Sequence, residues 1–230
     1  TLNKKKHKIS FSGKFSKGID KRNTVYKLLK LLEKKKIINK KFEISIKKNI
    51  PQKSGMGGGS MNAASILSYF MKKKILNISN KKAKDLAYKV GSDVVLGLEK
   101  KNSILFKNKK IGRLNKKIDF HVLIVMANEG CSTKYIFSKV KKYSKPLYFN
   151  INKRFFETNY LVQSNNDLEN VVFKKYSKIK NLKYFLSSLP NIVFTRMTGS
   201  GSAIVAYFKS KKAVNNAARI FRRKYKNYWY

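Results

Sequence analysis

The chain has 230 residues, of which 42% are hydrophobic and 13% aromatic, so it can bury a core and is not expected to be intrinsically disordered. Its single cysteine, Cys131, excludes an intramolecular disulfide, and no Cys or His lies near it at metal-ligand spacing. No apolar run reaches the roughly 20 residues that span a bilayer, so we expect a cytoplasmic protein without a membrane partner.

The net charge of +43, from 54 basic and 11 acidic residues, has two explanations. Lysines that neutralise phosphates give non-specific affinity for nucleic acids. However, the excess is almost entirely lysine, is spread along the whole chain and comes with no nucleic-acid-binding motif. Because Lys, Asn and Ile have A/T-rich codons, drift of the source genome explains the charge, and we expect no specific nucleic-acid partner. A basic nucleic-acid-binding protein remains the alternative.

The first part of the chain alternates strand and helix patterns. Strands are predicted over residues 8–13 and 42–47, the second half-buried because apolar and polar residues alternate. Helices are predicted from Asn23-Thr24 to the lysines at 34–36, from near Ser60, and from Ser79-Asn80 to Gly91, because apolar residues recur three and four apart. His7 is interpreted as a surface residue.

The same alternation continues to the end of the chain. Strands are predicted over residues 120–125, 192–194 and 203–208, and helices over 133–141, 168–176, 182–189 and around 214–221. The lysine-rich segment 107–117 is the expected boundary between two domains, 1–115 and 116–230. The predicted class is therefore α+β.

A glycine-rich stretch lies between the strand that ends near residue 47 and the next helix. It consists of Pro51, Gln52, Lys53, Ser54, Gly55, Met56, Gly57, Gly58, Gly59, Ser60 and Met61. A tight turn would explain one or two of these glycines. Four glycines within five positions, before a helix of small residues, let backbone N–H groups converge on an anion at the helix N-terminus. The stretch therefore predicts a polyphosphate site.

Two further segments carry polar groups that we single out. Gly199-Ser200-Gly201 lies between two predicted strands, and by itself it indicates a hairpin turn. Asp93 follows the glycine that ends a predicted helix, and by spacing alone it is typical of a cap or a turn. Neither segment would define a site without further information.

The stretch from Pro51 to Ala64 resembles the second motif of the GHMP kinases, Pro-x-x-x-Gly-Leu-Gly-Gly-Gly-Ser-Ser-Asn-Ala-Ala, from which it departs at Met56 and Met61. Three other stretches resemble segments of the same family in the same order. These are Gly91-Ser92-Asp93-Val94, Asn166-Asp167-Leu168-Glu169 and Thr195-Arg196-Met197-Thr198-Gly199-Ser200-Gly201-Ser202. The resemblance implies a two-domain GHMP-kinase-like fold whose C-terminal domain is a ferredoxin-like α/β sandwich.

The resemblance also implies an ATP-dependent kinase with Mg²⁺ as a second cofactor. In that interpretation residues Pro51 to Met61 bind ATP, and Asp93 is the catalytic carboxylate that accepts the proton of the attacking hydroxyl. Thr198, Gly199, Ser200 and Gly201 close on the phosphates and the substrate. Met61 lacks the hydroxyl of the family serine, and we assign no metal ligand.

Within the family, the resemblance is greatest to kinases that phosphorylate the 2-hydroxyl of a cytidine-diphosphate-linked small molecule in isoprenoid precursor synthesis. Homoserine, mevalonate or a sugar is the alternative acceptor, and a homodimer is possible. The family's N-terminal motif Pro-x-Ala-Lys-x-Asn-Leu has no counterpart between Thr1 and Asn49. We therefore expect the N-terminal domain to be incomplete in this chain, and the chain alone to have little kinase activity.

Overall fold

The computed structural model describes residues 6–106, 110–115, 118–145 and 152–230, which pack into two compact units. Unit 1 comprises the described residues up to Pro51 together with Gly57–Lys101, and unit 2 comprises Gln52–Met56 together with the described residues from Asn102 onward. Within these ranges no helix is both long and apolar enough to cross a membrane. Residues 107–109 and 116–117 of the expected boundary segment lie outside the described residues, and the boundary at residue 115 stays a prediction.

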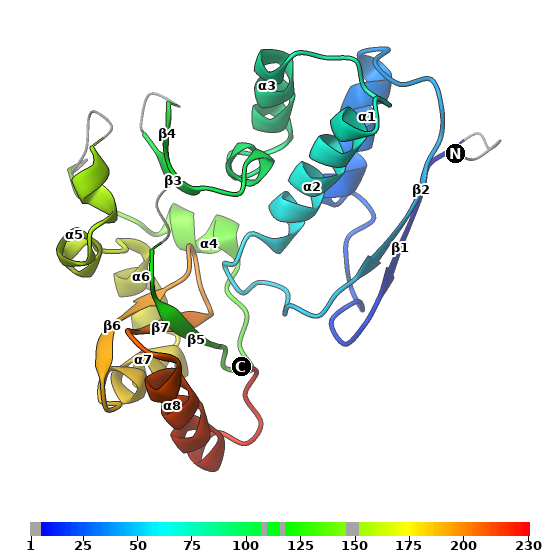
Figure 1. Ribbon diagram of the computed structural model, residues 1–230. Coiled ribbons are helices and arrows are strands. Elements are labelled where there is room, and N and C mark those ends of the chain that lie inside the picture. The colour runs from blue at the N-terminus through cyan, green and yellow to red at the C-terminus, as the bar shows by residue number, and fades with distance from the viewer. Residues whose placement is uncertain (1–5, 107–109, 116–117, 146–151) are drawn as a thin grey trace. The chain divides into compact units, whose positions relative to one another are not determined.

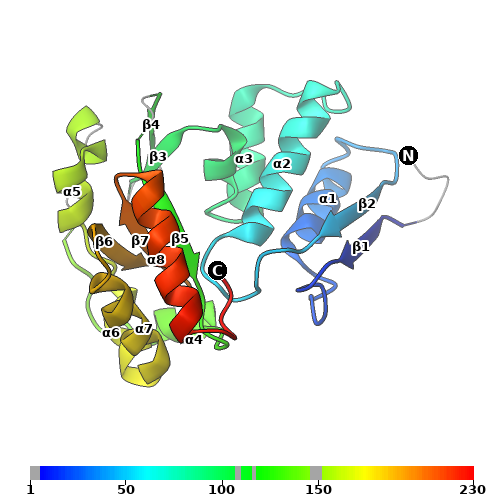
Figure 2. The same ribbon diagram turned by 60° about the horizontal axis from the view of Figure 1, so that its bottom comes forward.

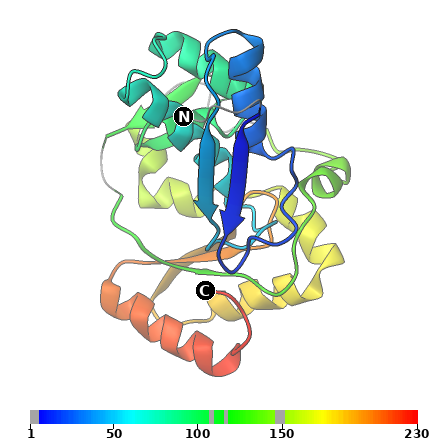
Figure 3. The ribbon, with the colours of Figure 1, turned by 90° about the vertical axis from the view of Figure 1, so that its right-hand side faces the viewer.

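Unit 1 contains a pair of parallel strands and three α-helices (Figure 1). In chain order its elements are β1 (Lys8–Ser12), α1 (Thr24–Lys34), β2 (Glu43–Lys47), α2 (Gly58–Lys72), α3 (Asn80–Val90) and the short 3-10 helix η1 (Val95–Leu98). Strands β1 and β2 lie side by side, in register from Lys8 opposite Glu43 to Ser12 opposite Lys47 (Figure 3). The strands and helices predicted for this part of the chain are confirmed, with the start of α2 two residues earlier than expected.

Helix α1 packs against α2 and α3 through its apolar stripe. Leu28, Leu29 and Leu32 are fully buried, as their spacing predicts for one face of a helix. The helix begins where the Asn23 side chain accepts hydrogen bonds from the first-turn N–H groups, among them that of Val25 at 3.0 Å. Capping and periodicity together therefore fix α1.

The interpretation of His7 as a surface residue is wrong, since its side chain is only 5% exposed. Its ring stacks on Phe42, whose backbone N–H donates to Nδ1 at 3.1 Å, and Nε2 lies 3.1 Å from Oε1 of Glu33. Burial lowers the pKa of His7, and the nearby Glu33 carboxylate opposes that change. The burial of His7 is explained by its contact with Glu33 of α1, which is 26 residues away in the sequence. No local sequence pattern predicts this contact.

Unit 2 contains two separate sheets and five α-helices among its described residues. The elements are β3 (Asn102–Leu105), β4 (Ile111–Leu114), β5 (His121–Val125), α4 (Thr133–Ser138), η2 (Lys153–Phe156), α5 (Thr158–Gln163), α6 (Leu168–Lys175), α7 (Ser177–Ser187), β6 (Ile192–Met197), β7 (Ile204–Phe208) and α8 (Lys211–Lys224). Helix α7 begins five residues before the predicted start at residue 182, and α4 ends three residues before residue 141. The strands and helices predicted for this half are otherwise present.

The larger sheet of unit 2 has the strand order β5-β7-β6, and every neighbouring pair is antiparallel. Trp229, after α8, pairs with Met126 just beyond β5 through two backbone hydrogen bonds of 2.8 and 3.2 Å. With Trp229 in the place of a fourth strand, the element order is that of a ferredoxin-like split βαβ unit. The expected C-terminal architecture is therefore present in a shortened form.

Helices α7 and α8 cover one face of this sheet (Figure 2), and Phe185 of α7 meets Phe221 of α8 there. Alternate residues of β7, including Ile204 and Phe208, belong to the buried core on this face. The intervening Tyr207 stacks on a neighbouring aromatic ring on the other face. This core fixes β6 and β7, and with them the loop that joins the two strands.

Candidate phosphate-binding site

The first half of the glycine-rich stretch, Gln52–Met56, belongs to unit 2 and is hydrogen bonded to the loop that follows β6. The Ser54 carbonyl accepts from the Ala203 N–H at 3.1 Å and from Thr198 Oγ1 at 2.6 Å. The Lys53 carbonyl accepts from the Ser202 N–H at 3.2 Å. Lys53–Ser54 and Thr198–Ala203 are therefore joined by hydrogen bonds to backbone carbonyl groups, although Ser54 and Thr198 are 144 residues apart in the sequence.

Gly55 allows this close approach. Its φ of +75° lies in the left-handed region, and a Cβ at this position would lie 2.0 Å from the Thr198 carbonyl oxygen and 2.9 Å from the Gly201 nitrogen. Both neighbours are backbone atoms and cannot rotate away. Gly55 is therefore required by the contact between the two loops.

The second half of the stretch belongs to unit 1 and forms the start of α2. Gly57, with φ of +64°, precedes the helix and no side chain caps it, whereas Asn23 and Ser79 cap α1 and α3 with side-chain oxygens. The N–H groups of the first turn, beginning at Gly58, thus have no capping side chain. Free N–H groups and the positive end of the helix dipole suit an anion such as a phosphate.

Lys48, just after β2, is a residue of this site that the sequence reasoning missed. Its Nζ lies 3.4 Å from the position that a Cβ of Gly58 would occupy, so its charge is beside the first turn of α2. Burial lowers the pKa of Lys48, and within the described part of unit 1 it forms no ion pair. In the sequence, its position directly after a half-buried strand and three residues before Pro51 could have indicated that Lys48 lies near the glycine-rich stretch.

Asp93 lies in unit 1 in the turn that joins α3 to η1. Its backbone carbonyl accepts from the Leu96 N–H at 3.2 Å, which is the turn role that spacing alone indicated. Its carboxylate is exposed and accepts from Ser92 Oγ at 3.3 Å, and no basic side chain of the described residues forms an ion pair with it. The side chain is therefore accessible to a substrate hydroxyl.

The segment Thr198–Gly201 connects the antiparallel strands β6 and β7, as a hairpin turn would. It is closed by hydrogen bonds from the Thr198 N–H to the Ala203 carbonyl at 2.9 Å and from the Gly201 N–H to the Thr198 carbonyl at 2.7 Å. Ser200 is 6% exposed, and its hydroxyl lies 2.8 Å from Thr133 Oγ1 at the start of α4. The Ser200 side chain thus attaches the loop to the start of α4.

The residues predicted for the site are divided between the two units. Unit 1 holds Asp93, Pro51 and the segment Gly57–Met61, and unit 2 holds Gln52–Met56 together with Thr198–Gly201. The Met61 sulfur lies 2.9 Å from the position of a Cβ on Gly97, so Met61 packs over η1. Among these groups, the structure brings Gln52–Met56 and Thr198–Gly201 together.

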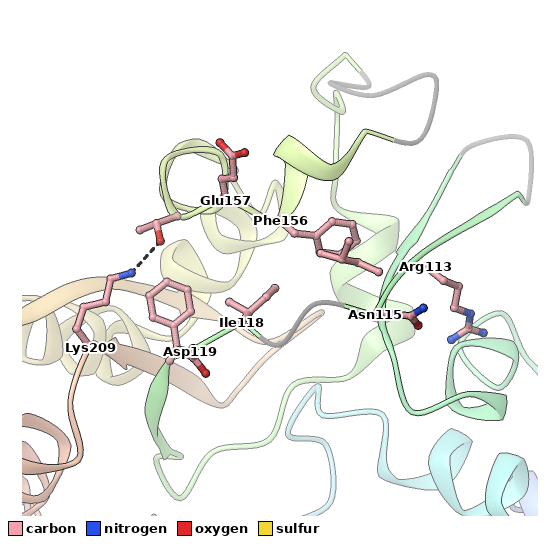
Figure 4. Close-up of a pocket in the computed structure, with 10 residues that line it drawn as sticks. Arg113, Asn115, Ile118, Asp119, Phe156, Glu157 and Lys209 are labelled. Atoms are coloured by element: carbon pink, nitrogen blue, oxygen red, sulfur yellow. Dashed lines mark hydrogen bonds between the residues drawn. The ribbon is translucent and has the colours of Figure 1, made fainter.

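Unit 2 also has a cavity of about 770 Å³ that contains none of the predicted site residues (Figure 4). Arg113, Phe156 and Lys209 are among its lining residues, and Lys209 Nζ donates to Thr158 Oγ1 at 2.9 Å. Over the ranges that the structure describes, no three His, Cys, Asp or Glu side chains are grouped so that they could hold a metal ion.

Two protein-family models match the chain. The GHMP kinases N terminal domain matches residues 23–100, and the GHMP kinases C terminal domain matches residues 155–227. Among solved structures, a 4-(cytidine 5'-diphospho)-2C-methyl-D-erythritol kinase aligns with a TM-score of 0.68 at 20% identity, over 95% of this chain and 79% of that one. A homoserine kinase from Cytophaga hutchinsonii aligns with a TM-score of 0.69 at 15% identity, over 99% and 81%. These identities establish the fold alone.

Curated relatives are more similar in sequence. The 4-diphosphocytidyl-2-C-methyl-D-erythritol kinase of Pelagibacter ubique is 51% identical over 99% of this chain and 81% of the relative. The protein of the same name from Clostridium tetani is 30% identical over 90% of this chain and 76% of the relative. With two family models that together cover more than half of its length, the chain belongs to the GHMP kinases, which are ATP-dependent kinases of small molecules.

Proposed function

We propose that this protein transfers the γ-phosphoryl group of ATP to a hydroxyl of 4-diphosphocytidyl-2-C-methyl-D-erythritol, in the non-mevalonate route to isoprenoid precursors. The 51% identity to a kinase of that name carries the choice of acceptor. The cytoplasm is the proposed location, because the reaction consumes ATP. A homodimer stays a prediction. Size-exclusion chromatography with light scattering would measure the oligomeric state.

The uncapped start of α2 is the observation that supports ATP binding. Its first-turn N–H groups and the Lys48 ammonium beside Gly58 provide hydrogen bonds and positive charge for the phosphates. Mg²⁺ would be held mainly by phosphate oxygens, since it commonly uses only one or two protein carboxylates. When bound, the ion neutralises charge on the transferring group.

Asp93 is proposed as the general base. Its carboxylate would accept the proton of the acceptor hydroxyl while that oxygen forms a bond to the γ-phosphorus and the bond to the β,γ-bridging oxygen breaks, releasing ADP. An exposed carboxylate without an ion-pair partner among the described residues can take this role directly. The rest of the protein's contribution is to position the two substrates and to stabilise charge, on which phosphoryl transfer mainly depends.

Asp93→Asn in the full-length protein tests this proposal. Turnover of the cytidylated alcohol should fall by about 10²- to 10⁴-fold, the usual contribution of a general base, while the affinity for a non-hydrolysable ATP analogue stays within about twofold. Asp85→Asn, an exposed acidic residue of α3, is the matched control and should turn over normally. Normal turnover by the Asp93 variant would refute the assignment of the base.

The acceptor needs its own test, since solved structures of kinases for different acceptors share this fold. The full-length enzyme should be assayed with the cytidylated erythritol, homoserine, mevalonate and galactose at equal concentrations. We expect kcat/KM to be highest for the cytidylated substrate by at least about tenfold, because cytidine contacts add binding energy. A preference for any other alcohol would overturn the choice of acceptor and leave the kinase assignment intact.

A further inference from the structure

Asn166, directly before α6 in unit 2, holds the backbone on both sides of Thr198. Its Nδ2 donates to the Met197 carbonyl at 3.0 Å and to the Gly199 carbonyl at 2.8 Å, and its Oδ1 accepts from the Leu168 N–H at 3.0 Å. An amide group has two N–H donors and one carbonyl acceptor, and all three of these functions are used. Aspartate has the same shape but lacks the donors.

Glu169, in the first turn of α6, adds a second anchor for the same segment. Its Oε1 accepts from the Met197 N–H at 2.8 Å, and its other oxygen pairs with Lys183 of α7. The N–H and the C=O of Met197 are therefore both fixed by the start of α6. The end of β6 has little freedom to shift as the chain enters the loop.

The segment Met197–Gly199, which Asn166 and Glu169 hold, also contacts the glycine-rich stretch. Thr198, between the two carbonyls bound by Asn166, donates to the Ser54 carbonyl and lies against Gly55. Gly199, the second residue bound by Asn166, has a φ of +44°, and the hydrogen bond from Asn166 to its carbonyl helps to hold that conformation. A shift of the loop after loss of the Asn166 hydrogen bonds would therefore move Thr198, and with it Ser54 and Gly55.

We infer that Asn166 is a positioning residue for phosphoryl transfer, which acts by holding Thr198–Gly201 and, through Thr198, the segment Ser54–Gly55 in the geometry that binds ATP. The inference rests on the proposed role of this loop at the phosphates. Hydrogen bonds to two carbonyl groups are the function required, and only a side chain with two donors supplies them. A carboxylate at this position would repel both carbonyl oxygens.

The test uses Asn166→Asp and Asn166→Ser in the full-length enzyme. Both variants keep an oxygen that can accept from the Leu168 N–H. An ionised aspartate has no donor and a serine has one, so neither variant can donate to both carbonyl groups. The matched control is Asn152→Asp, because Asn152 Oδ1 accepts from the Arg154 N–H at 2.9 Å and so caps a different element, η2. Thermal unfolding followed by circular dichroism establishes that each variant is folded.

Both Asn166 variants should raise KM for ATP and weaken binding of a non-hydrolysable ATP analogue by about tenfold or more, as expected for a misplaced binding loop. KM for the acceptor alcohol should stay within about twofold, and the Asn152 variant should match the parent. Partial unfolding alone would lower kcat in proportion to the folded fraction and leave both KM values unchanged. Unchanged analogue affinity in folded Asn166 variants would overturn the inference.

Analogue binding separates this inference from the proposed function. If the parent enzyme binds the ATP analogue but phosphorylates no alcohol of the panel, the proposed acceptor is wrong, and the inference on Asn166 is still decided by the analogue affinities. If the parent enzyme does not bind the analogue, both are refuted. Calorimetric titration of the parent and the three variants gives these affinities.

Discussion

The two halves of the glycine-rich stretch use their glycines in different ways. In Gln52–Met56 the backbone is engaged by the protein itself, since the Ser54 carbonyl accepts from Ala203 and Thr198, and Gly55 leaves room for a carbonyl group. In Gly57–Met61 the first-turn N–H groups of α2 have no capping side chain. The first half thus makes a backbone contact with the loop after β6, whereas the second half, Gly57–Met61, leaves the helix start uncapped. We call Gly57–Met61 the ligand half, because its N–H groups are the ones proposed to bind phosphate directly.

The largest effect expected from this difference is that of Gly55→Ala. The added Cβ would lie 2.0 Å from the Thr198 carbonyl oxygen, and the residue has a left-handed φ that alanine tolerates poorly. We expect the free energy of unfolding to fall by about 3 kcal/mol or more, as for other substitutions that combine strain with overpacking. Urea unfolding followed by circular dichroism measures it, and a loss below about 1 kcal/mol would show that the loop contact yields easily.

Gly58→Ala is the same chemical change in the other half of the stretch. Its Cβ would lie 3.4 Å from Lys48 Nζ, which is an ordinary contact, and alanine favours a helix over glycine by up to about 1 kcal/mol. This variant should therefore be as stable as the parent or slightly more so. Its affinity for ATP should nevertheless fall by about tenfold or more, since a methyl group would hinder a phosphate from reaching the first turn. Equal loss of stability in both glycine variants would remove the distinction between the halves.

Local patterns predicted most of the secondary structure and the location of the loop. The cap at Asn23, the apolar stripe of α1 and the alternation in β2 are short-range features, and each is present in the structure. The glycine-rich stretch could be recognised in the same way. What no local pattern encodes is its division at Met56, because that depends on Thr198, which is 144 residues from Ser54.

The same limit explains the residues that were missed or misinterpreted. His7 is buried because Phe42 and Glu33 approach it from other elements, and Lys48 was missed because its side chain lies beside Gly58, ten residues further along the chain. In a chain with 54 basic residues, one functional lysine cannot be distinguished by composition. Roles that depend on tertiary contacts require the fold before they can be assigned.

Lys48→Met gives the next largest effect and tests the ligand half of the stretch. The change removes a positive charge beside Gly58 but keeps a flexible side chain of similar length, so KM for ATP should rise by about tenfold, the value of one charge-assisted hydrogen bond. Lys47→Met is the matched control, since Lys47 is the exposed neighbour on the opposite face of β2, and its KM should not change. Equal KM values for the two variants would exclude Lys48 from the site.

The smallest effect concerns the acid stability of unit 1, which carries the ligand half. Burial alone would raise the pKa of Glu33, but hydrogen bonds from Lys41 and Lys30 outweigh it and lower the pKa from 4.5 to about 2. The native state therefore binds a proton on Glu33 less readily than the unfolded state does. The stabilisation from Glu33 is fully present above pH 4.5 and is lost as the pH falls toward 2.

Glu33→Gln removes this titration, so the difference in unfolding free energy between parent and variant should be largest at neutral pH and shrink between pH 4.5 and 2. Trp229, the only tryptophan, lies in unit 2, so its fluorescence follows that unit, whereas circular dichroism follows the helices of both. The pH-dependent difference should be seen by circular dichroism and be smaller by Trp229 fluorescence. Glu43→Gln, which breaks an exposed pair with Lys8, should have little effect at any pH. If both probes changed equally, the two units would unfold together, and the halves of the glycine-rich stretch would differ in their contacts but share one stability.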